Sequence, residues 1–171
     1  MNSNVFLLGL IEILSAISMG LVILSTTYKM LKWYGKKRFD IGHNNVAYSI
    51  FIASVLFGMG LMVSGTIEPI VSSFRLLSNT EESTTGLFVS FLLRGGIYIF
   101  IAYSAGLFIS IIGIMIYSKL TPIDEFVEMK NNNIGVALIS GAIIITLILL
   151  TKDGVALVIE SLIPYPELPP R

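Results

Sequence analysis

The sequence predicts an all-α membrane protein with four transmembrane helices in two parallel two-helix repeats. Of its 171 residues, 54% are hydrophobic and only 13% are charged, whereas about a quarter of the residues of a soluble domain are charged. Four apolar stretches are long enough to cross a hydrocarbon core about 30 Å thick, and the two halves share a weak internal similarity. Lipid offers backbone amides no partner, and the strict alternation of a membrane barrel strand is absent, so the stretches should be helices.

The first expected span begins close to the amino terminus. No Lys or Arg precedes its apolar run, and no A-x-A-like cleavage site follows it. These features favour a retained helix over a cleaved signal peptide. The four expected spans are about Val5 to Tyr28, Val46 to Ser64, Gly95 to Tyr117 and Ile134 to Thr151.

The connection from Lys29 to Asn45 carries the strongest charge signal, with five basic residues against one acid, Asp40: Lys29, Lys32, Lys36, Lys37 and Arg38. Basic residues beside spans are retained in the cytoplasm, so this connection should be inside and both termini outside. Lys119 and Lys130 in the third connection agree with this orientation. The sequence therefore predicts a multi-pass membrane protein with both termini on the outer side of the membrane.

The second connection divides into two parts. Ile67 to Leu77 is apolar with polar interruptions and is expected to form an interfacial helix. Ser78 to Gly86 is polar and turn-rich, which favours a solvated outer loop. At the other end of the chain, residues 164–171 form a proline-rich tail that should be extended.

A shift of 88 residues aligns the two halves, pairing Asn44 and Asn45 with Asn132 and Asn133 just before the second and fourth spans. Two copies in the same orientation imply a pseudo-twofold axis along the membrane normal. We expect one transmembrane domain over residues 1–171, with repeat one at about 5–77 and repeat two at about 87–163.

Asn45 and Asn133 are expected to cap the second and fourth helices, which we prefer to ligand contact. Small residues recur at four-residue spacing in the second and third spans, where they allow close helix approach, within the bundle or between copies. These helix-packing residues are Ser54, Gly58, Ala102, Gly106 and Ser110.

Two charged residues stand out in or beside the membrane. Glu12 lies about a third of the way into the first span, where a bare carboxylate is unfavourable. It could be protonated, could pair with Arg94 at the start of the third span, or could line an ion path. The alternative role of Arg94 is to extend towards the outer head groups.

The sequence predicts neither a cofactor nor a metal or catalytic site. There is no cysteine, and the single histidine, His43, lacks a second imidazole to share a metal. Nucleophile elbows, phosphate loops and zinc-protease motifs are missing, so we expect no enzyme activity. A formal net charge of zero gives no attraction to nucleic acid.

The third span is followed by an acidic box, residues 121–126, with the sequence Thr-Pro-Ile-Asp-Glu-Phe; its candidate residues are Thr121, Pro122, Asp124 and Glu125. With Thr121 as cap and Pro122 in the first turn, the box predicts a short helix. Its alternative role is a docking surface with Asp124 and Glu125 as exposed charges, joined by Lys36, Lys37 and Arg38 from the first connection.

The box is followed by Asn133, which opens a span that contains Gly141. In this pattern the sequence resembles the domain of unknown function 350 family. The resemblance is strong over about Ser110 to Ser161 and weaker in the first half, where WYGKKRFD replaces the acidic box. It implies a small bacterial inner-membrane protein of paired two-helix units, associated with a larger assembly linked to envelope or membrane-stress maintenance.

Two functions follow as expectations. The first is a noncatalytic membrane subunit or scaffold that contacts lipid, copies of itself or other membrane subunits, and a soluble cytoplasmic partner. The alternative is a small ion or solute transporter or channel with Glu12 at its working site.

Overall fold

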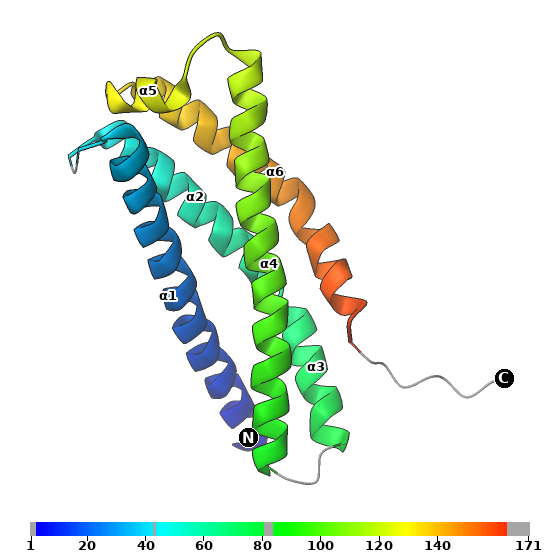
Figure 1. Ribbon diagram of the computed structural model, residues 1–171. Helices are drawn as coiled ribbons and strands as arrows, with labels where there is room; N and C mark the ends of the chain where they lie inside the picture. The colour runs from blue at the N-terminus through cyan, green and yellow to red at the C-terminus, as the bar shows by residue number, and fades with distance from the viewer. Residues whose placement is uncertain (1–2, 43, 81–83, 164–171) are drawn as a thin grey trace, which may run out of the picture.

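The computed structural model describes residues 3–42, 44–80 and 84–163. These residues fold into helices joined by short connections (Figure 1). The helices are α1 Ser3–Phe39, α2 Val46–Ser64, α3 Ile67–Thr80, α4 Thr84–Leu120, α5 Glu125–Lys130 and α6 Ile134–Glu160. The expected all-α class is confirmed, and α2 has the bounds that the sequence predicts.

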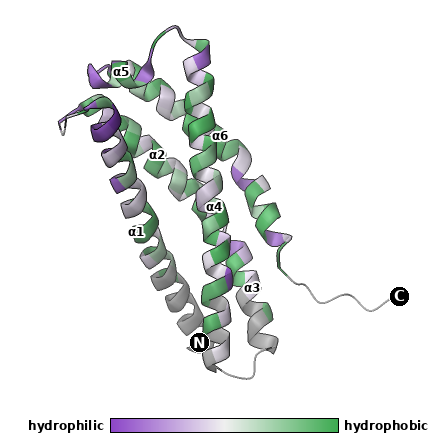
Figure 2. Ribbon diagram, viewed as in Figure 1, coloured by the Kyte–Doolittle hydropathy of each residue, from purple (hydrophilic) through white to green (hydrophobic). Residues whose placement is uncertain are grey.

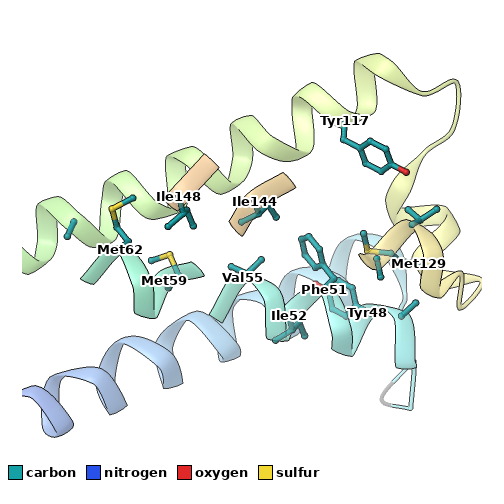
Figure 3. Packing of buried hydrophobic residues seen from close by; sticks show 14 of the residues in the cluster. Tyr48, Phe51, Ile52, Val55, Met59, Met62, Tyr117, Met129, Ile144 and Ile148 are labelled. Atoms are coloured by element: carbon teal, nitrogen blue, oxygen red, sulfur yellow. The ribbon is translucent and has the colours of Figure 1, made fainter. Parts of the chain in front are cut away.

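The core lies between α2, α4 and α6. The most extensive contact is between α2 and α6, and α4 packs against both helices. Phe51, Val55 and Met59 follow one another at four-residue spacing on α2 and are buried against Ile144 and Ile148 of α6 (Figure 3). Because lipid tails are as apolar as these side chains, close packing and dispersion hold the helices together.

A narrow stripe attaches α1 to the other helices. Ile23, Thr27 and Gly35 are buried at multiples of four residues, and the Thr27 hydroxyl donates to the Tyr103 hydroxyl of α4 at 3.3 Å. On the opposite face, Ile17 and Leu21 are exposed. An apolar face that is exposed in the monomer is typical of a helix that borders lipid or another membrane subunit.

Three segments among the described residues are long and apolar enough to cross a membrane: Val46–Ser73, which continues from α2 into α3, Leu92–Leu120 in α4, and Ile134–Glu160 in α6. These three segments support the assignment of the chain to a membrane. A fourth span on α1 and the parallel repeat both remain predictions.

The first connection is largely helical, contrary to expectation. α1 continues to Phe39, because no proline interrupts residues 29–39 and the basic residues of the last turn stabilise the negative end of the helix. The helix stops where Asp40 adopts a left-handed conformation, with φ of 53°. The basic residues from Lys29 to Arg38 thus project from a helix rather than from a loop.

The second connection is also shorter than expected. α3 reaches Thr80, and α4 starts at Thr84 instead of near Gly95. Hydropathy marks only the part of a helix that lies in lipid, so polar turns that continue the same helix into water escape this signal. Residues 81–83, His43 and the proline-rich tail 164–171 lie outside the described residues.

Candidate functional site

The connections of α1 to α2 and of α4 through α5 to α6 meet at one end of the molecule (Figure 1). We call this region, residues 29–49 and 119–133, the basic end. Figure 2 shows its hydrophilic character in the last turns of α1 and in α5, beside the largely hydrophobic α2, α4 and α6. The predicted docking residues and both asparagine pairs lie here.

Asn45 joins the two halves of the chain. Its Oδ1 accepts from the Tyr48 backbone N–H at 2.7 Å, which makes it the N-cap of α2. Its Nδ2 donates to the carbonyls of Met129 and Lys130, at 2.7 and 3.0 Å, near the end of α5. One amide therefore satisfies the start of one helix and the end of another. The sequence predicts the cap but not the second contact.

The second asparagine pair also contributes a hydrogen bond between the two halves of the chain. Asn132 Oδ1 accepts from the Ala47 backbone N–H in the first turn of α2, at 3.0 Å. Asn132 has a left-handed φ of 63°, which turns the chain sharply out of α5. Asn133 then caps α6 by accepting from the Val136 N–H at 3.4 Å, and it donates to Glu128 Oε2 at 2.8 Å. Asn45 and Asn132 thus each make hydrogen bonds between the two halves of the chain.

Phe126 fixes α5 to the helices beside it. Its ring stacks on Phe39 of α1, while Tyr34 and Phe51 meet it edge to face with centroids 5.9 and 5.8 Å away. Beside it, Met129 is fully buried. These contacts hold a six-residue helix that is too short to be stable alone.

The acidic box differs from the prediction in two respects. Asp124 is the N-cap of α5, accepting from the Phe126 and Val127 N–H groups at 3.0 and 3.1 Å, so the prediction of Thr121 as cap is wrong. Glu125 is only 2% exposed and accepts from the Thr121 hydroxyl at 2.9 Å, so it is not a surface charge. A buried carboxylate needs such a donor, and Thr121 supplies it instead of capping.

The other docking candidates are exposed. Lys36, Lys37 and Arg38 occupy the last turn of α1, and the Lys37 ammonium lies 4.6 Å from the centre of the Trp33 ring. Pro122 and Asp124 are exposed before α5. Lys130 and Asp40 form an exposed ion pair at 3.7 Å that links α5 to the end of α1. The surface is basic, with Asp124 at one side.

The small residues of the packing ladders lie against neighbouring helices. A methyl group on Gly141 of α6 would collide with the Ser54 hydroxyl of α2, and one on Gly58 would lie 2.6 Å from Ile148 Cδ1. A methyl group on Gly106 of α4 would lie 2.8 Å from Met59 Sδ. Ala102 and Ser110 are also buried. Of the two interfaces that the sequence left open, these residues occupy the one within the chain.

Gly35 has a role that the sequence reading missed. A methyl group there would collide with the Tyr48 ring, whose hydroxyl donates to the Leu31 carbonyl at 2.6 Å. The ring therefore lies directly on the backbone of α1. Nothing in the sequence signals this role, because Gly35 falls in the first connection, where a loop is expected.

The described residues do not test the predicted pairing of Glu12 with Arg94. Arg94 is partly exposed on α4. Glu12 belongs to α1, but its side chain lies outside the described part of the chain. The pairing of Glu12 with Arg94 therefore stays a prediction.

These features define an all-α membrane protein whose two halves interlock at one end. The chain belongs to the family described as Domain of Unknown Function (DUF350), whose model matches residues 5–152. This match confirms the resemblance seen in the sequence, and it includes the acidic box and both asparagine pairs. No curated protein and no solved structure matches the chain.

Proposed function

We propose that this protein is a noncatalytic subunit or scaffold of a larger assembly in a bacterial inner membrane. The observation that carries the proposal is that the basic end presents charges on a fixed surface. Lys36, Lys37 and Arg38 project from a helix whose last turn is held by the Phe39–Phe126 stack. Because the backbone that carries these charges is already ordered, only their side chains lose conformational freedom when they meet a partner.

The partner of this surface is a soluble cytoplasmic factor with an acidic face. The three basic residues have no ion pair within the described residues, where Lys130 pairs with Asp40 instead. Complementary charge would speed the encounter and orient the partner. Membrane subunits or further copies of the chain would contact the exposed apolar face of α1, since the small-residue ladders are used inside the bundle.

The proposed orientation places the basic end in the cytoplasm and both termini in the periplasm. Because the chain has no cysteine, single cysteines at Lys36 and Ser161 report on the two ends of the bundle. An impermeant thiol reagent added to spheroplasts should label Ser161→Cys, and should label Lys36→Cys only after permeabilisation. The reverse pattern would overturn the orientation.

Extraction of the tagged protein in native lipid, followed by mass determination, tests the assembly. We expect stoichiometric companion chains or a defined homo-oligomer, and loss of the soluble companion from the Lys37→Glu, Arg38→Glu double variant. Lys152→Glu, near the far end of α6, reverses a charge away from the basic end and should retain it. A partnerless monomer would contradict the proposal and favour the transporter alternative, for which ion flux into liposomes should fall in Glu12→Gln.

A further inference from the structure

A pocket with a volume of about 120 Å³ opens between α1 and the start of α2. Its α1 wall carries Tyr28, Lys32 and Lys36, and its α2 wall carries Ser49 above the apolar Ile52. A cavity needs about 10–15 Å³ of such volume to hold one water, so the pocket can hold a group as large as a phosphate. The pocket thus combines two cations with an apolar floor.

The two lysines have no counter-charge in the described structure. Ion pairs among the described residues join Lys130 to Asp40 and Lys152 to Asp153, not Lys32 or Lys36 to an acid. The Lys32 ammonium is held in place, because it donates to the Tyr28 hydroxyl at 2.9 Å. Since Tyr28 accepts this bond, its own proton remains available to an oxygen in the pocket.

The pocket lies at the level where the chain enters lipid. The segment that can cross the membrane begins at Val46, three residues before Ser49. Tyr28 lines the pocket and is exposed on α1. Tyrosine is enriched at the depth of the lipid head groups, so the two lysines on the same pocket wall face phosphate rather than hydrocarbon.

We propose that this pocket binds the phosphate group of an anionic phospholipid. Lys32 and Lys36 supply positive charge and ammonium donors, and the Tyr28 hydroxyl supplies a third donor to the phosphate oxygens. Ile52 forms the floor towards the hydrocarbon core and contacts the first carbons of the lipid. Free phosphate shares the charged contacts but not this apolar one, which is why we assign the pocket to a lipid.

Native mass spectrometry of the purified full-length protein tests the assignment, with phosphatidylglycerol and phosphatidylcholine added at equal concentration. We expect one retained phosphatidylglycerol per chain, in preference to phosphatidylcholine. A hydrogen bond between charged groups contributes about ten-fold or more to binding, so Lys32→Gln/Lys36→Gln should weaken retention by about 100-fold or more. Lys37→Gln/Arg38→Gln removes the same charge outside the pocket and should retain the lipid.

Two further outcomes are decisive. Ser49→Leu fills the pocket without changing charge and should also lose the lipid, with an unchanged helical circular dichroism spectrum. Equal losses in the two charge-matched double variants would show a diffuse field instead of a pocket and overturn the proposal. Displacement of the lipid by millimolar inorganic phosphate would assign the site to free phosphate and overturn the lipid assignment.

Discussion

Phe126 of α5 stacks face to face on Phe39 of α1, with ring centroids 4.5 Å apart and planes inclined by 9°. The two rings come from opposite halves of the chain, so this contact joins the two halves through side chains. Together with the hydrogen bonds of Asn45, it fixes α5 against the basic end.

Phe126→Ala should detach α5 from α1 and α2. Removing a buried aromatic ring destabilises a protein by about 3–5 kcal/mol, and we expect the lower end of this range because Phe126 is partly buried. We expect faster amide hydrogen exchange throughout α5, measured by mass spectrometry in micelles. Val127→Ala, at an exposed neighbouring position, should leave exchange nearly unchanged. Equal exchange in the two variants would mean that Phe126 does not anchor the helix.

Asn45→Asp should separate the two roles of this side chain. The aspartate still accepts from the Tyr48 N–H and can cap α2, but it faces the Met129 and Lys130 carbonyls with a carboxylate that donates nothing. We expect a loss of about 1–3 kcal/mol in the free energy of unfolding, measured by titration with SDS. Asn44→Ala, at the exposed preceding position, is the control. A stability close to that of the wild type would leave α2 capping as the only role of Asn45.

Gly141→Ala should force α2 and α6 apart where they cross, because the added methyl group collides with the Ser54 hydroxyl. Overpacking of this kind destabilises proteins by about 1–3 kcal/mol. The second variant Ser54→Gly should restore stability to Gly141→Ala by removing the obstructing atoms. Gly154→Ala, on the same helix with open space around it, should not be destabilised. Failure of the rescue would place the strain elsewhere.

Thr121→Val should destabilise the α4–α5 connection by about 1–3 kcal/mol, because it removes the hydroxyl that donates to the buried Glu125 carboxylate. Thr121→Ser keeps the donor and should behave like the wild type. Glu125→Gln removes the charge of this carboxylate. Because the two side chains are hydrogen-bonded, the double variant Thr121→Val, Glu125→Gln should lose less stability in thermal unfolding than the sum of the two single variants. Additive effects would show that the two side chains act independently.

The sequence anticipated the elements that depend on local chemistry and missed those that depend on distant contacts. Asn45 and Asn133 cap helices because an amide oxygen before an apolar run satisfies free N–H groups whatever the tertiary structure. The burial of Glu125 depends on how α5 folds back on the bundle, and no local pattern encodes it. The extension of α1 to Phe39 escaped a hydropathy reading because charged turns look like loops even when they are helical.

The hydrogen bond from the Ala47 N–H to Asn132 spans 85 residues of chain, and this separation sets an order of events during synthesis. At about 5–20 residues per second, about 4–17 seconds pass between the translation of Ala47 and that of its acceptor. During that interval the first half of the protein enters the membrane while the Ala47 N–H, in the first turn of α2, lacks its acceptor. Release of the nascent chain into lipid before the second half arrives would leave it reliant on water, or on an insertion factor, for the missing acceptor.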